Sequence, residues 1–138
     1  MTDSATITRH MVGGAPDPVA PFSHAVGFKD LLFVTGQIPQ DPRTHAVLGG
    51  TMAEQTHRVM KNLAIVLAGL GRGFEHVLAA RVFITDFSQY EAMNEVYRSY
   101  FEAGKLPART CIGVTGLAGG ADVEIDLVVA RDGEAGRR

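Results

Sequence analysis

The stretch LPARTCIGVTGLAGGADVEIDLVVA, residues 106–130, contains two strand-like runs separated by a glycine-rich segment. The first run, about 109–116, begins with Arg109 directly after Pro107 and Ala108, and the second covers about 122–130. The joining segment LAGGA favours a turn because glycine adopts backbone conformations that other residues avoid. The stretch therefore predicts two strands that close the chain, with a permanent cation at the head of the first.

Strand-like segments also precede this stretch, at 5–9, 24–28, 31–36 and 77–85. The second and third of them are separated only by Lys29 and Asp30, which indicates a hairpin. Residues 36–50 carry three turn-forming segments and are expected to form a loop.

Two helices are predicted from capping boxes, in which a Ser or Thr side chain and a Glu three residues later bond each other's backbone N–H groups. Thr51 with Glu54 begins the first helix, and Ser88 with Glu91 begins the second. Each is expected to end at a glycine: Gly71 and Gly104. The order β-β-β-α-β-α-β-β predicts an α+β fold, with two helices packed on one face of a sheet.

In the predicted strands LLFV, VLAARVFI and VEIDLVVA, apolar residues occupy both odd and even positions and do not alternate cleanly with polar ones. That pattern is typical of a sheet buried on both faces, and two helices can cover only one. Because a large exposed apolar surface usually marks an interface, we expect an obligate homo-oligomer whose sheets pack against one another.

The 138 residues suit one domain over 1–138, with 1–4 and 132–138 expected to be flexible. The formal net charge of −2, with no clustered basic patch, argues against nucleic acid as a partner. No apolar run reaches the roughly 18 residues of a membrane span, and the first residues lack the pattern of a signal peptide. A cytoplasmic protein without a membrane partner is expected.

Arg109 has two interpretations. A guanidinium can bind a substrate carboxylate through two parallel N–H groups, which lysine cannot do. Alternatively, it forms a structural ion pair with one of the acids that follow: Asp122, Glu124 or Asp126. The pattern alone leaves both open.

Glu124 shares a predicted strand face with Asp126, while Val123, Ile125 and Leu127 share the other. A carboxylate in such surroundings can act as a general acid or base with a raised pKa. The alternative is a charge on an edge strand that prevents aggregation.

Pairing of the two final strands in a hairpin would place Gly113 opposite Glu124, and Arg109 about four residues, on the order of 13 Å, further along. The two charged residues are then too far apart to pair within one chain. If both serve one site, we expect it to be built across a subunit interface.

Three weaker candidates remain. Cys111 shares a strand face with Arg109 and is expected to line a site or pack, not to act as a nucleophile. Asn94 lies beside the apolar stripe of the second helix, where a solvated or capping amide is the alternative to a site residue. The five histidines show no metal-ligand spacing, so no metal site is assigned.

The chain resembles the Rid/YjgF family of enamine/imine deaminases, also known as endoribonuclease L-PSP-like proteins, over about residues 5–131. The resemblance is carried by PARTCIGV and VEID around Arg109 and Glu124, and by APFSHAV (20–26), VTGQIP (34–39) and the helix around Asn94. It implies a chorismate-mutase-like homotrimer with sites between subunits. The activity it implies is the hydrolysis of reactive enamines and imines to 2-keto acids and ammonia, without a cofactor.

By the same resemblance, Arg109 would bind the carboxylate of a small substrate and Glu124 would activate water. Further residues would shape the pocket: Phe22, Thr35, Gly36, Asn94 and Cys111. Phe22 stands where the deaminases commonly have tyrosine, and Thr35 where they often have serine. These departures leave open a paralogous subfamily with another substrate. A non-catalytic carboxylate sensor is a separate alternative, and a ribonuclease is another, against which the net charge counts.

Overall fold

A computed structural model describes residues 6–131, and the two ends predicted to be flexible, 1–4 and 132–138, lie outside that range. The elements follow the predicted order, with three short 3₁₀ turns added. They are β1 (Thr8–His10), β2 (Ala25–Phe28), β3 (Leu31–Gln37), α1 (Met52–Gly69), η1 (Phe74–His76), β4 (Val77–Ile84), η2 (Phe87–Gln89), α2 (Tyr90–Arg98), β5 (Ala108–Gly113), η3 (Ala118–Gly120) and β6 (Val123–Ala130).

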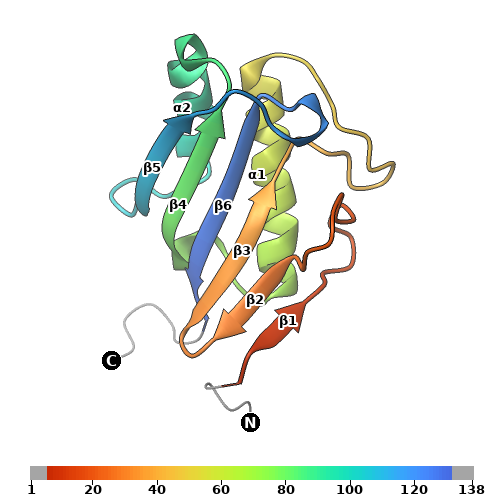
Figure 1. Ribbon diagram of the computed structural model, residues 1–138. Coiled ribbons are helices and arrows are strands. Elements are labelled where there is room, and N and C mark those ends of the chain that lie inside the picture. Colours follow the sequence, from red (N-terminus) through yellow and green to blue (C-terminus); the bar gives the residue numbers. More distant parts are fainter. Residues whose placement is uncertain (1–5, 132–138) are drawn as a thin grey trace.

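The six strands form one mixed sheet in the order β1-β2-β3-β6-β4-β5, and both helices lie on the same face of it (Figure 1). The predicted α+β architecture is therefore confirmed, as is the β2–β3 hairpin. The predicted pairing of the last two strands is wrong. β4 lies between them, parallel to β5 and antiparallel to β6, so the segment that joins β5 to β6 crosses the end of β4.

The predicted start of α1 is confirmed in full. The Thr51 hydroxyl accepts a hydrogen bond from the Glu54 N–H, and the Glu54 carboxylate accepts one from the Thr51 N–H. The predicted capping box at Ser88 is wrong. The Ser88 N–H donates to the carboxylate of Asp86, which caps η2, and α2 begins only at Tyr90. Helix α2 also ends at Arg98, before the predicted Gly104.

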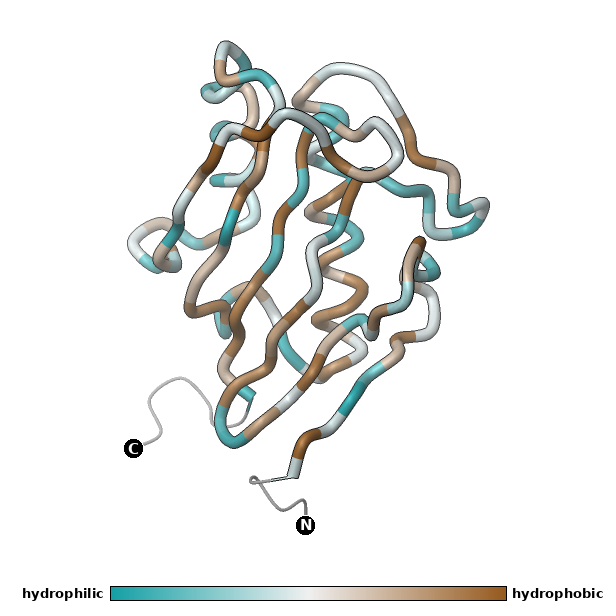
Figure 2. The backbone as a smooth tube through the Cα atoms, viewed as in Figure 1, coloured by the Kyte–Doolittle hydropathy of each residue, from teal (hydrophilic) through white to brown (hydrophobic). Residues whose placement is uncertain are grey.

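The core lies between the sheet and the helices. One face of β6 is buried there together with the inward side of α1, and brown apolar segments in Figure 2 follow the central strands and this helix. Residues on the inward face of β6 are fully or almost fully buried: Val123, Ile125, Leu127 and Val129. No helix within 6–131 is both long and apolar enough to cross a bilayer.

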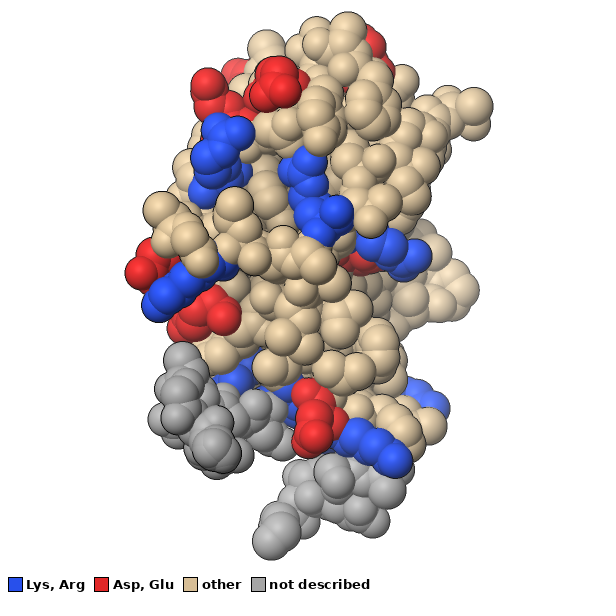
Figure 3. Space-filling view, turned by 90° about the vertical axis from the view of Figure 1, so that its left-hand side faces the viewer, with Lys and Arg blue, Asp and Glu red and all other residues tan. Residues whose placement is uncertain are grey.

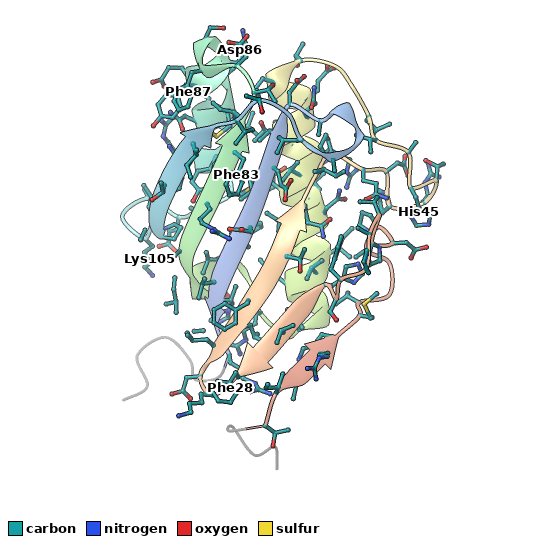
Figure 4. The ribbon with its side chains drawn as sticks, viewed as in Figure 1. Phe28, His45, Phe83, Asp86, Phe87 and Lys105 are labelled. Carbon is teal, nitrogen blue, oxygen red and sulfur yellow. The ribbon has the colours of Figure 1, made fainter. Side chains whose placement is uncertain are left out.

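The opposite face of the sheet has no covering layer among the described residues. β6 alternates between buried and half-buried positions, so one chain buries this sheet on one side only. Phe33 and Ile112 remain 46% and 43% exposed on the open face, where Phe83 also lies over β4 (Figure 4). The expectation of a sheet covered on both faces is therefore not met within one chain.

Candidate functional site

Of the seven residues proposed for the site, all but Cys111 line one of two hollows. The first, here the Glu124 cavity, has a volume of about 200 Å³ and contains Phe22, Thr35, Gly36 and Glu124 in its lining. The second, here the Arg109 hollow, has a volume of about 220 Å³ and is lined by Asn94, Tyr97, Arg98, Leu106, Pro107 and Arg109. Neither of these two hollows contains both Arg109 and Glu124.

Strand register shows on which face of the sheet Glu124 and Arg109 lie. Glu124 is paired with Phe83, and Phe83 is paired with Ile112, so these three side chains lie on the open face. Arg109 is three residues before Ile112 on β5, and successive side chains of a strand point to opposite faces. Arg109 therefore lies on the helix-covered face.

The backbone of β3 passes very close to the Glu124 carboxylate. The pairing of β3 with β6 is irregular between Val34 and Gln37, and Gly36 lies in this interruption. A Cβ atom at Gly36 would clash with Glu124 Oε2 and would lie 2.9 Å from the carboxyl carbon. Glycine is therefore required here by the close approach of the side chain.

Glu124 carries a carboxylate with no hydrogen bond or ion pair to any other residue in 6–131. Burial raises the pKa of Glu124, and the negative charge of Asp126 on the same strand raises it further. Asp126 itself is bound by Arg81 in a bidentate pair, with Nη2–Oδ2 at 2.7 Å. Because β6 is a central strand, Glu124 is not the edge-strand charge that the sequence left open.

The wall of the Glu124 cavity is formed by a loop held in place by His24. The buried His24 ring accepts a hydrogen bond from the Val12 N–H at Nδ1 and donates from Nε2 to the Pro16 carbonyl, both at 2.8 Å. Thr35 donates its hydroxyl to the Ser23 carbonyl at 2.6 Å. The Thr35 oxygen thus keeps only acceptor capacity toward the cavity.

Arg109 is held by neutral acceptors. Its Nη1 donates to Asn94 Oδ1 at 2.7 Å and its Nη2 to the Tyr90 hydroxyl at 3.0 Å. The guanidinium carbon also lies 5.0 Å from the centre of the Tyr97 ring and 5.6 Å from that of Tyr90, within the range of cation–π attraction. Figure 3 shows this side of the molecule, where Lys and Arg side chains and Asp and Glu side chains are scattered over a largely uncharged surface.

The structural ion pair considered for Arg109 does not form with any of the three acids. Asp122 accepts hydrogen bonds from Gln55 Nε2 and from the Thr85 hydroxyl, both at 2.9 Å, and Asp126 is bound by Arg81. No carboxylate within 6–131 neutralises Arg109. Asn94 is likewise neither a capping nor a merely solvated amide, because it binds the guanidinium.

Cys111 lies on the face of β5 that carries Arg109 and packs against the edge of the core. Burial raises the pKa of the thiol, and the positive charge of Arg109 opposes that shift only in part. A thiol of this kind is protonated at neutral pH and suits packing better than nucleophilic attack. Among the residues with described positions, no group of three His, Cys, Asp or Glu side chains could hold a metal ion.

Two tyrosines beside Arg109 were missed as site candidates in the sequence. Tyr90, Asn94 and Tyr97 follow one another at i, i+4 and i+7 on α2, which places them on one helix face. Tyr97 fits the apolar stripe of that helix, so its ring alone did not suggest contact with a cation. The spacing of Tyr90 and Tyr97 from Asn94 was the signal in the sequence that could have identified both tyrosines as neighbours of a site residue.

Comparison with known proteins gives consistent results. The family model described as endoribonuclease L-PSP matches residues 12–131. Protein DfrA of Myxococcus xanthus is 41% identical over 116 residues, which are 83% of this chain and 88% of that protein.

Solved structures also match. YyfA of Yersinia pestis, described as a protein of unknown function of the conserved Rid protein family, superposes with a TM-score of 0.86 at 30% identity, over 91% of this chain and 99% of its own. TdcF of E. coli, solved with bound serine, superposes with a TM-score of 0.81 at 25% identity, over 90% of this chain and 100% of its own.

Proposed function

The chain belongs to the Rid/YjgF family, also called endoribonuclease L-PSP, and from this premise we propose that it hydrolyses reactive imines and enamines of small amino acids to 2-keto acids and ammonia. The observation that carries the proposal is the state of Arg109. Its guanidinium is oriented by Tyr90 and Asn94 without being neutralised by a carboxylate among the described residues. A substrate carboxylate is the natural counter-charge for such a group.

The chemistry needs little more than orientation and one acid/base group. A protonated imine carbon is electrophilic, so water can add to it when a base removes the water proton. Glu124 takes that proton in the proposed step and returns it to nitrogen. The hydroxyl proton of the carbinolamine then passes to Glu124 as the C–N bond breaks, which gives the keto acid and ammonia, and Glu124 finally releases this proton to solvent. The raised pKa of Glu124 lies closer to neutral pH than that of an ordinary carboxylate. A general acid or base transfers protons most effectively when its pKa is near the pH of the reaction.

A single chain cannot supply both groups to one small substrate, because Arg109 and Glu124 lie on opposite faces of the sheet. We therefore propose a homotrimer in which the Arg109 hollow of one chain meets the Glu124 cavity of the next. The exposed apolar residues of the open face, Phe33 and Ile112 among them, support an interface there. Sedimentation of a stable monomer at micromolar concentration would exclude this arrangement.

Turnover is tested with an amino-acid oxidase that generates imines in the presence of the protein. The initial rate of 2-keto-acid formation should exceed that in buffer. It should fall to the buffer rate in Arg109→Ala, which loses the carboxylate contact, and drop at least about a hundred-fold in Glu124→Gln, which loses the proton acceptor. Unchanged rates in both variants would refute the proposal.

A binding protein without catalysis is the second candidate, favoured by the side chains in the Glu124 cavity. Phe22 offers no hydroxyl there, and the Thr35 hydroxyl proton is already donated to Ser23. In that case 2-keto acids would raise the melting temperature through Arg109 while the oxidase assay showed no acceleration. A ribonuclease role fits less well, since the formal net charge is −2 and nucleic-acid affinity depends on neutralising phosphates.

A further inference from the structure

The Tyr90 hydroxyl occupies a special position beside the guanidinium of Arg109. Tyr90 is the first residue of α2, and its oxygen lies 3.0 Å from Arg109 Nη2. Asn94, one turn further along the helix, bonds the other terminal nitrogen at 2.7 Å. The hydroxyl is thus next to the N–H groups that a carboxylate would approach.

The direction of this hydrogen bond follows from the chemistry of its partners. A guanidinium has N–H donors and no acceptor, so the Tyr90 oxygen must accept. The phenolic proton then points elsewhere, and it has no acceptor among residues 6–131. Tyr90 therefore presents an unused O–H donor at the edge of the guanidinium.

Packing fixes the place of that donor. The Tyr90 ring stacks on Phe87, with ring centres 5.2 Å apart and planes 20° apart. Figure 4 labels Phe87 beside Asp86, at one end of the molecule. A stacked ring leaves its hydroxyl little freedom beyond rotation about the C–O bond. Donors that are fixed in advance bind a ligand with less loss of entropy.

We propose that Tyr90 is a substrate-binding residue that donates its phenolic hydrogen bond to the same carboxylate that Arg109 binds. The inference rests on the proposed function, because it requires a carboxylate at Arg109. One carboxylate oxygen is shared between Arg109 Nη2 and the Tyr90 hydroxyl. Tyr90 thus supplies the Arg109 side of the site with a hydroxyl, whereas Phe22 supplies none to the other side.

Binding of pyruvate, measured by isothermal titration calorimetry on the full chain, tests the proposal. Tyr90→Phe keeps the stacked ring and removes the donor, so the Kd should rise about ten-fold, as expected for a hydrogen bond to a charged group. Tyr100→Phe is the matched control, because its hydroxyl bonds His57 and lies outside both hollows. Its Kd should equal that of the wild type.

Fluorination of the Tyr90 ring distinguishes two roles of its hydroxyl: donating a hydrogen bond to the ligand, or only accepting one from Arg109. A 3-fluorotyrosine at position 90 keeps the ring and is a stronger donor and a weaker acceptor than tyrosine. Tighter pyruvate binding than in the wild type supports donation, whereas weaker binding overturns it.

The remaining outcomes separate this inference from the proposed function. An unchanged Kd in Tyr90→Phe, with binding abolished in Arg109→Ala, overturns the role of Tyr90 and leaves carboxylate binding intact. Absence of pyruvate binding to the wild type overturns both.

Discussion

Arg109 and Glu124 lie on opposite faces of one sheet, although only one strand separates β5 from β6. Arg109 faces α2, where Tyr90 and Asn94 hold it, and Glu124 faces the open side next to Gly36. Strand alternation makes this arrangement rigid, because no side-chain rotation moves a residue through a sheet. A reaction that uses both groups therefore requires two chains.

Mixed oligomers provide the test of a shared site. We expect Arg109→Ala and Glu124→Gln chains, each inactive alone, to regain imine hydrolysis when they are co-expressed and purified together. With random mixing, about a quarter of the sites between chains would receive an intact Arg109 from one chain and an intact Glu124 from its neighbour. The rate of keto-acid formation should recover to about that fraction of the wild-type rate.

The matched control is co-expression of Arg109→Ala with the double variant that carries both substitutions. This mixture contains no chain with an intact Arg109, so no site can regain activity. Absence of recovery in the first mixture, with mixed oligomers verified by mass spectrometry, would show that the two residues do not act together across an interface.

Gly36 allows a second test, which separates ligand binding from turnover. In Gly36→Ala the new methyl group must displace the Glu124 side chain, whose Cδ and Cγ atoms lie 2.9 Å and 3.0 Å from the ideal Cβ position. We expect at least a ten-fold lower kcat, because the acid/base group is misplaced, with the Kd for pyruvate at Arg109 unchanged. Gly116→Ala, where a Cβ would have no neighbour within 4 Å, should keep wild-type kcat.

Much of the fold could be predicted from the sequence because its elements are marked locally. Thr51 and Glu54 identify the start of α1, and apolar spacing identifies the strands. The place of β4 between β5 and β6 could not be predicted in the same way. A short glycine-rich connection is compatible with a hairpin and with a crossover over one strand, and only the packing of α2 on the sheet decides between them.

The candidate site shows the same division. Arg109 and Glu124 stand out in the sequence as charges in apolar strands, and the structure brings Asn94 to Arg109 and Gly36 to Glu124. The predicted lack of contact between the two charges within one chain is confirmed, although the hairpin used to argue it is wrong. Tyr90 was not predictable as an Arg109 partner, because this contact depends on how α2 packs against β5.

The raised pKa of Glu124 predicts a pH-dependent stability difference. The Glu124 carboxylate is harder to ionise in the folded chain than in the unfolded chain, where its pKa has the ordinary value of 4.5. Its contribution to stability is therefore fully present below about pH 4.5 and is lost as the pH rises through the raised value. Glu124→Gln carries no such charge, so its melting temperature should exceed that of the wild type at pH 8.

Thermal unfolding monitored by circular dichroism from pH 4 to pH 8 measures this difference. The gap between Glu124→Gln and the wild type should shrink toward zero at the acid end. Glu95→Gln, which removes an exposed carboxylate on α2, controls for the loss of one charge. A gap that is constant over the whole range would contradict the cause assigned to the pKa shift.

Tyr97 separates the role of an aromatic ring beside Arg109 from that of its hydroxyl. The residue is 5% exposed, and its hydroxyl has no hydrogen-bond partner in the described part of the chain. Burial raises the pKa of Tyr97 to about 12, so the phenol is neutral at any ordinary pH. An unsatisfied buried hydroxyl costs about 1 kcal/mol or more.

Tyr97→Phe should therefore raise the melting temperature by roughly 2–4 °C and leave pyruvate affinity unchanged, because the ring still faces Arg109. Tyr97→Leu removes that ring and should weaken pyruvate binding several-fold, since the guanidinium loses its cation–π support. Calorimetry measures the affinities, and thermal unfolding of the same samples measures stability. A lower melting temperature in Tyr97→Phe would show instead that the hydroxyl gains a partner when chains assemble, and would place Tyr97 at the interface between them.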